Sequence, residues 1–125
     1  MKNQSEIILT WLDANVNNQQ NKETFDKLCE KFGDCWQFSD KSDFNRFLGR
    51  HAYNQRRIIF IVSGQIGENL VPDIHENSNI LSIYVYCSWR EYHEKWSKPY
   101  SKVKVVTKVD DLFSEIQSDF KSYEN

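Results

Sequence analysis

Two long apolar runs near the middle of the chain constrain its fold more than any other feature of the sequence. They extend over Arg57 to Ser63, "RIIFIVS", and Ile80 to Cys87, "ILSIYVYC". A strand that is buried on one face alternates apolar and polar residues, whereas a central parallel strand is buried on both faces and is nearly continuously apolar. The two runs therefore predict the centre of a parallel sheet with helices on both sides.

Shorter strands and amphipathic helices are predicted around these two runs. The strands are expected at Glu6 to Leu12, Trp36 to Phe38 and Lys102 to Thr107. Apolar residues at the three- and four-residue spacings of amphipathic helices lie between and after the strands. They are Phe25, Leu28, Cys29 and Phe32; Phe44, Phe47, Leu48 and His51; and Val109, Leu112, Phe113, Ile116 and Phe120.

Capping residues and one proline indicate where the helices begin. Ser42 is expected to cap the second helix, and Asp110 and Asp111 suit the start of the last helix, whose dipole favours acidic side chains. Pro72 lacks a backbone N–H, and its ring clashes inside a regular helix. We therefore expect the third helix either to start near Pro72 or to be a kinked turn and a short helix within Gly67 to Glu76.

The alternation of strands and helices predicts one α/β domain over residues 1–125. Five strands that are each followed by a helix, with right-handed crossovers, form a doubly wound parallel sheet, and a common five-stranded order is the flavodoxin-like 2-1-3-4-5. Ligands of such sheets bind at the carboxyl ends of strands 1 and 3. Here those ends are "LDANVN" and "VSGQIG", so any chemistry of the chain is expected there.

The overall composition narrows the function classes. Basic and acidic residues number 16 and 18, the net charge is −2, and no long run of like charge predicts a nucleic-acid partner. No apolar stretch approaches the ~20 residues that span a bilayer, and "MKNQSE" does not resemble a signal peptide. The three cysteines are loosely spaced, which favours free thiols in a reducing compartment. We therefore expect a soluble, cytoplasmic domain without membrane or nucleic-acid contacts.

The predicted crevice contains six candidate ligand-binding residues. Backbone N–H groups at the turn after the third strand could contact a small anion or nucleotide. Asp13, Asn15 and Asn17 begin like a calcium-binding EF-hand loop, but Asn18 and Thr24 stand where that loop needs Gly and Glu. The alternative is structural, because Asp and Asn favour turns and a small residue with a glycine suits a sharp turn. The candidates are Asp13, Asn15, Asn17, Ser63, Gly64 and Lys108.

The order of elements and the position of Asp13 resemble a CheY-like receiver domain of two-component signalling over nearly the whole chain. The resemblance implies a nucleophilic aspartate at the end of strand 3, two acidic residues after strand 1 for Mg²⁺, and a lysine after strand 5. This chain has Ser63 in place of the nucleophile, Asp13 without an acidic neighbour, and Lys108 near strand 5. A serine hydroxyl is a much weaker nucleophile than a carboxylate unless a base activates it. The comparison therefore predicts a degenerate receiver without aspartyl phosphorylation.

Two other families share parts of the same pattern. "TWLDANV" and "IIFIVSG" resemble the first two motifs of haloacid-dehalogenase-type phosphohydrolases, which implies Asp13 as nucleophile and Ser63 as a phosphate-binding residue. Asn15 departs from that family, because an amide cannot act as its general acid and base. The phrases "LDANVN", "RIIFIVSG", "IYVYCSW" and "KVKVVTKVDDLFSEIQSDF" are similar to N-terminal domains that precede mono-ADP-ribosyltransferase or tetratricopeptide regions in some invertebrate multidomain proteins. That similarity implies an accessory module.

An aromatic segment follows the fourth strand and is the candidate partner surface. Trp89, Tyr92, Trp96 and Tyr100 recur at helical spacing within "CSWREYHEKWSKPYS". Trp, Tyr and Arg dominate binding hot spots, and the receiver resemblance implies that partners or dimers dock on helix 4, strand 5 and helix 5. The alternative is that Trp89 and Trp96 cover the sheet while Tyr92 and Tyr100 lie at its edge.

The sequence therefore predicts a non-catalytic regulatory or protein-interaction module that turns over no phosphodonor. A protein partner or a fused domain is expected. The alternatives are a haloacid-dehalogenase-like phosphohydrolase that uses Asp13 and an accessory domain of an ADP-ribosyltransferase. No cofactor or metal is expected, because His51, His75 and His93 lie in separate segments and none is closely paired with a cysteine.

Overall fold

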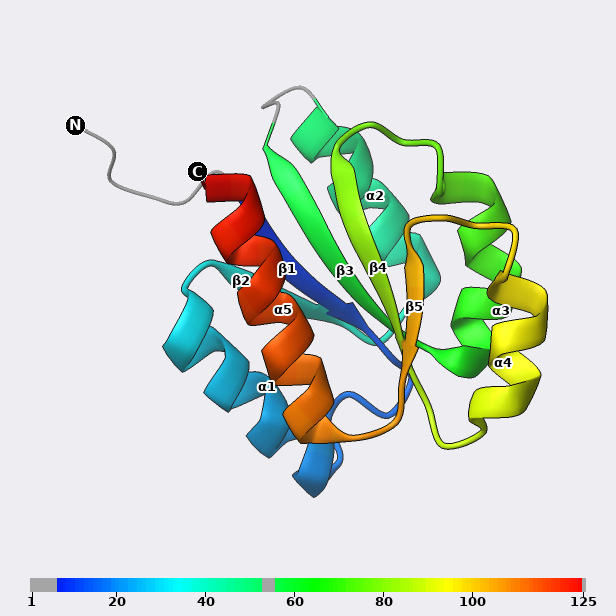
Figure 1. Ribbon diagram of the computed structural model, residues 1–125. Coiled ribbons are helices and arrows are strands. Elements are labelled where there is room, and N and C mark those ends of the chain that lie inside the picture. Colours follow the sequence, from blue (N-terminus) through cyan, green and yellow to red (C-terminus); the bar gives the residue numbers. More distant parts are fainter. Residues whose placement is uncertain (1–6, 53–55, 125) are drawn as a thin grey trace.

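The computed structural model describes residues 7–52 and 56–124, with their side chains except at positions 51, 52 and 124. The predicted strand start at Glu6 and the side chain of His51 lie outside the described part. Five strands and five helices alternate along the described part of the chain (Figure 1). They are β1 (Ile7–Leu12), α1 (Gln19–Phe32), β2 (Cys35–Phe38), α2 (Lys41–Ala52), β3 (Arg57–Ser63), α3 (Gly64–Ile74), β4 (Ile80–Tyr86), α4 (Arg90–Ser97), β5 (Val103–Val106) and α5 (Val109–Glu124).

All five strands form one parallel sheet in the order β2-β1-β3-β4-β5, which confirms the predicted fold class and strand order. Helices α2, α3 and α4 cover one face of the sheet, and α1 and α5 cover the other (Figure 1). Leu12 of β1 is aligned with Val62 of β3, and Ser63 is aligned with Tyr86 of β4. The residue that follows β1 and the residue that ends β3 are therefore neighbours at the carboxyl edge.

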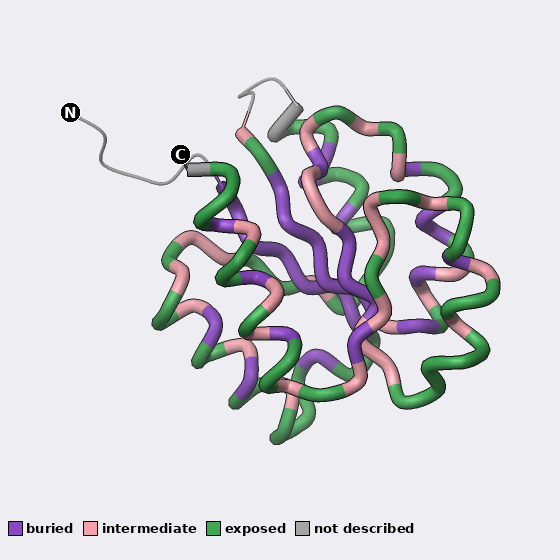
Figure 2. The backbone as a smooth tube through the Cα atoms, viewed as in Figure 1, coloured by how far each residue is buried: buried purple, intermediate pink, exposed green. Residues whose placement is uncertain are grey.

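β3 is buried on both of its faces, and Figure 2 shows the buried central strands between the two helical layers. Ile58, Ile59, Phe60, Ile61 and Val62 are all 0% exposed. Alternate side chains of a strand point to opposite faces. Thus Ile58, Phe60 and Val62 join the core beneath α2, α3 and α4, whereas Ile59 and Ile61 join the core beneath α1 and α5. This two-sided burial explains the continuous apolar sequence of β3.

Helix α3 corrects the predicted position of Pro72. The helix begins at Gly64, directly after β3, and Pro72 lies near its end rather than at its start. Ser63 caps the helix, because its hydroxyl accepts the N–H of Ile66 at 3.4 Å. Pro72 removes one backbone hydrogen bond near the end of the helix, and the full burial of Val71 against the core offsets that loss.

The start of α2 also differs from the prediction. Asp40, rather than Ser42, caps this helix: Oδ1 of Asp40 accepts the N–H of Ser42 at 2.6 Å, and its carbonyl accepts the N–H of Phe44 at 3.2 Å. A carboxylate caps a helix at least as well as a hydroxyl. The helix therefore begins at Lys41, two residues before the start that a cap at Ser42 predicts. The start of α5 agrees with the prediction, since Asp110 and Asp111 lie in its first turn.

Cys29 and Cys35 are joined by a disulfide, so the expectation of free thiols is wrong for these two residues. Gly33 has a positive φ of 87°, a conformation that favours glycine, and its N–H donates to the Cys29 carbonyl at 3.0 Å. The chain thereby reverses between α1 and β2, which brings the two cysteine Cα atoms to 5.6 Å. Cys87 is a free thiol.

We expect thiol labelling to distinguish these cysteines. Protein denatured without a reductant should be alkylated at Cys87 alone, whereas reduced protein should be alkylated at all three cysteines, as measured by mass. Reduction should lower the free energy of unfolding by about 2 kcal/mol, because the cross-link restricts the unfolded chain. The Cys87→Ser control should leave no reactive thiol before reduction. Three labels on unreduced protein would contradict the pairing of Cys29 with Cys35.

A buried tyrosine joins the sheet to α5. Tyr84 of β4 is 0% exposed. Its hydroxyl donates to the carboxylate of Asp119 and also lies 3.3 Å from the carbonyl oxygen of Glu115. Burial is the main cause that raises the pKa of Tyr84 above its usual value of 10.0, and the hydrogen bond to Asp119 raises it further. The folded state therefore favours the protonated phenol.

We expect Tyr84→Phe to lower the free energy of unfolding by about 1 kcal/mol near neutral pH, because the hydrogen bond to Asp119 is lost. Above about pH 10, tyrosine ionises in the unfolded chain while folded Tyr84 keeps its proton, so the wild type loses stability as the pH rises. The difference in the free energy of unfolding between the wild type and Tyr84→Phe should therefore shrink above about pH 10. Urea unfolding over a pH series measures it, with the exposed Tyr123→Phe as control. A pH-independent difference would contradict the expected linkage.

Candidate functional site

Asp13 directly follows β1 at the carboxyl edge of the sheet and is held in a turn. It is only 8% exposed. Its Oδ1 accepts the N–H of Asn15 at 2.8 Å, and its carbonyl accepts the N–H of Val16 at 3.0 Å. The N–H of Asp13 donates to the carbonyl of Phe38 in β2 at 3.0 Å. These are the contacts of an Asx turn, and they favour the structural interpretation of Asp13.

The two asparagines of the same loop face solvent. Asn15 and Asn17 are exposed, and the buried Val16 lies between them. Asn18 caps α1 by accepting the N–H of Asn21 at 2.8 Å, and the side chain of Asn21 donates to the Asn15 carbonyl at 3.0 Å. The loop thus serves to start α1. Within residues 7–52 and 56–124, no group of three or more His, Cys, Asp or Glu side chains could hold a metal ion.

The first glycine of "SGQIG" accommodates a ring from α4. A Cβ atom on Gly64 would lie 2.3 Å from Nε2 of His93, whereas one on Gly67 would lie 3.1 Å from Cγ1 of Val62 and at an ordinary contact distance of 3.5 Å from Cη2 of Trp96. The ring of His93 therefore lies directly against the first residue of α3. Because a methyl group does not fit beneath this ring, Gly64 permits the close approach of α4 to α3.

A hydrogen bond between two α4 side chains orients the ring of His93. Its Nδ1 accepts the indole N–H of Trp96 at 2.7 Å. Trp96 and Tyr100 are half-buried and pack against the core beneath α2, α3 and α4. Sequence reasoning did not select His93 as a site residue. The signal that could have indicated it is Gly64, the first residue of α3, which leaves space for a ring from a neighbouring helix.

Trp89 and Tyr92 form the exposed part of the aromatic segment, and we call this pair the aromatic platform. Their ring centroids lie 4.8 Å apart at an interplanar angle of 22°. Trp89 is 63% exposed and Tyr92 is 38% exposed. The Tyr92 hydroxyl lies 2.8 and 2.7 Å from the two carboxylate oxygens of Glu68 on α3, to which it donates. This hydrogen bond is the main cause that raises the pKa of Tyr92.

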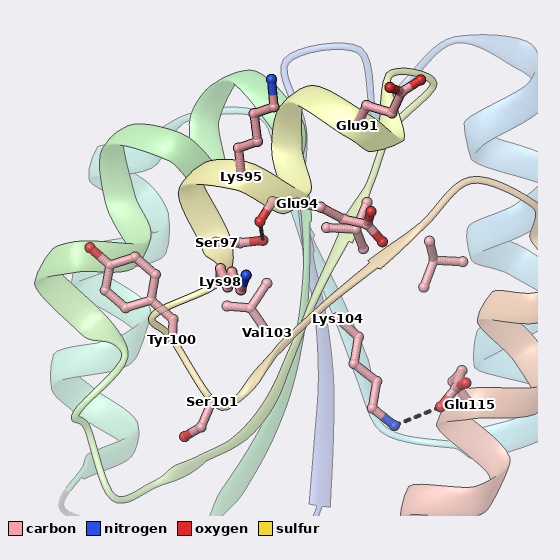
Figure 3. Close-up of a pocket in the computed structure, with 12 residues that line it drawn as sticks. Glu91, Glu94, Lys95, Ser97, Lys98, Tyr100, Ser101, Val103, Lys104 and Glu115 are labelled. Atoms are coloured by element: carbon pink, nitrogen blue, oxygen red, sulfur yellow. Dashed lines mark hydrogen bonds and ion pairs between the residues drawn. The ribbon is translucent and has the colours of Figure 1, made fainter.

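A charged groove of about 810 Å³ lies between α4 and β5 (Figure 3). Lys104 of β5 pairs with Glu115 of α5 at 2.8 Å. Arg90 donates to the carbonyl of Val105 at 3.2 Å and pairs with Glu94 at 3.4 Å. Charged side chains in and around the groove therefore partly satisfy one another. The residues that line it are Glu91, Glu94, Lys95, Ser97, Lys98, Tyr100, Ser101, Val103, Lys104, Val105, Val106 and Glu115.

The candidate Lys108 and the free thiol of Cys87 also lie along the carboxyl edge of the sheet. Lys108 is exposed and follows β5, which is two positions from β3 in the strand order, about 10 Å at the usual strand spacing. Cys87 follows β4, and burial raises the pKa of its thiol. A raised pKa leaves little thiolate at neutral pH, and the thiolate is the reactive form.

Comparisons with protein-family models, curated proteins and solved structures found no match to this chain. The arrangement of its own side chains is therefore the basis for a functional interpretation. That arrangement consists of a carboxyl edge whose polar groups form turns and caps, and an aromatic platform that is open to solvent. Among the helices that the structure describes, none is long and apolar enough to cross a bilayer.

We expect Gly64→Ala to lower the free energy of unfolding by about 1 to 3 kcal/mol, because the added methyl group collides with the His93 ring. In a His93→Ala background, the same substitution should cost much less, since the collision is removed. Denaturant unfolding of the wild type, both single variants and the double variant measures this coupling. Gly49→Ala is the control, because nothing lies within 4 Å of its added Cβ atom. Equal costs in both backgrounds would be evidence against the ring contact.

Proposed function

We propose that this chain is a non-catalytic, receiver-like regulatory module that binds a protein partner. The observation that carries the proposal is the role of Ser63. This residue ends β3, where a receiver has its phosphoacceptor aspartate, and its hydroxyl accepts the N–H of Ile66 to cap α3. A capping hydroxyl without an activating base does not replace a nucleophilic carboxylate.

The surroundings of Asp13 also support an inactive crevice. Mg²⁺ favours an octahedral set of oxygen ligands, but Asp13 is followed by Ala14 rather than by a second acidic residue. One oxygen of the Asp13 carboxylate already accepts the backbone N–H of Asn15. Asn15 itself is an exposed amide at the position where a haloacid-dehalogenase-type enzyme needs an acid. These features favour the regulatory module over a phosphohydrolase.

The aromatic platform supports the proposed binding of a protein partner. Large aromatic residues are typical of binding hot spots. Trp89 is 63% exposed, which exceeds the exposure of Trp36 at 49% and Tyr123 at 43%. A partner on this surface would be a separate protein or a fused domain. A fused domain is what the similarity to modules before ADP-ribosyltransferase or tetratricopeptide regions implies.

We expect Mg²⁺, Mn²⁺ and Ca²⁺, each with and without beryllium fluoride, to leave the melting temperature of the protein unchanged. A ligand that binds only the folded state raises the apparent stability by RT ln(1 + [L]/Kd), so thermal-shift measurements would detect an acidic phosphate site. Asp13→Ala is measured in parallel. A shift that appears in the wild type and disappears in Asp13→Ala would overturn the non-catalytic assignment in favour of phosphoryl chemistry.

A further inference from the structure

We propose that the aromatic platform binds an arginine side chain in a basic segment of the partner. This inference rests on the proposed function and defines the chemistry of the partner. A guanidinium group stacks on the face of an indole ring and donates paired hydrogen bonds to a carboxylate. The platform offers both features, because Trp89 is open to solvent and Tyr92 is hydrogen-bonded to the carboxylate of Glu68.

The helix beside the platform carries only negative charge. Residues 64–79, which comprise α3 and the turn after it, contain Glu68, Asp73 and Glu76 and no lysine or arginine. On α4, Glu91 and Lys95 are both exposed, so this helix contributes charge of both signs. In the described part of the chain, neither Glu68 nor Glu91 forms an ion pair with a basic side chain. A partner with positive charge would complement the acidic side chains of α3.

The basic residue nearest in sequence to the platform is engaged elsewhere. Arg90 follows Trp89, but its guanidinium donates to the Val105 carbonyl and pairs with Glu94. The cation that lies over an aromatic ring in the described residues is Lys31 over Phe32, on α1. Trp89 stacks on Tyr92 through one face of its indole. Since the residue is 63% exposed, its other face is open to a guanidinium of the partner.

The geometry favours arginine over lysine. The lysine ammonium is a strongly hydrated point charge, whereas guanidinium is planar, weakly hydrated and able to stack while it donates in its plane. Glu68 accepts the hydroxyl of Tyr92, but a carboxylate has about four acceptor positions, so it can also accept guanidinium N–H groups. A basic segment would thus place one guanidinium on the open face of Trp89 and a neighbouring guanidinium against the Glu68 carboxylate, on the Tyr92 side of the platform.

An NMR titration with three peptides tests this proposal. Acetylated hexa-arginine, hexalysine and hexaglutamate are added to ¹⁵N-labelled protein, and the indole N–H signals of the tryptophans and the backbone N–H signals of α3 and α4 are followed. We expect hexa-arginine to shift the signal of Trp89, hexalysine to bind more weakly, and hexaglutamate to leave it unchanged. Trp89→Ala and Glu68→Gln should each weaken hexa-arginine binding by about fivefold or more. Glu68→Gln keeps an oxygen that can accept the Tyr92 hydroxyl, so it changes the charge with little change in packing.

Two matched controls test whether the effect is specific to the platform. Trp36→Ala removes another exposed indole, on β2, and Glu30→Gln removes an exposed carboxylate on α1; both should keep the wild-type affinity. The proposal is wrong if Trp89 does not respond to hexa-arginine, or if the controls weaken binding as much as the platform variants.

The same labelled protein is titrated with Mg²⁺ and beryllium fluoride. Shifts at Asp13 and Ser63 in that titration would overturn the proposed function, independently of the result at Trp89.

Discussion

The burial of β3 on both faces is the constraint on which the rest of the structure depends. A strand whose inner residues are without solvent contact from Ile58 to Val62 requires a helical layer on each side of the sheet. Parallel strands joined through such helices all end at the same edge, which places Asp13 beside Ser63. The polar crevice is thus a consequence of topology and exists whether or not it performs chemistry. Its residues serve as turns and caps in this chain.

Much of the fold could be predicted from the sequence because it depends on periodicity. The continuous runs of β3 and β4 and the helical stripe of α5 identify their elements without knowledge of tertiary contacts. A predicted helix boundary was wrong where it rested on a single residue rather than on the periodicity of the whole segment. Pro72 was expected to limit α3, but one missing hydrogen bond near the end of a helix costs less than the burial of its apolar face provides.

The details of the site depend on contacts between elements and are therefore harder to predict. Regular spacing grouped four aromatic residues together, but the packing of α4 on α3 divides them, with Trp96 against the core and Trp89 in solvent. The sequence position of Gly64 suggested a turn, whereas its ring neighbour comes from a helix about 30 residues later. The disulfide was likewise missed because its two cysteines meet only after the chain reverses at Gly33.

The hydrogen bond from Arg90 to the carbonyl of Val105 has a consequence for self-association. β5 is an outer strand of the sheet, and the outward backbone groups of such strands can pair with strands of other molecules and form aggregates. β5 is only 4 residues long, and a charged side chain of the same molecule already contacts one of its carbonyl groups. An incoming strand would have to displace that guanidinium. Arg90 thus helps to keep the chain from adding further strands at this end of the sheet at high protein concentration.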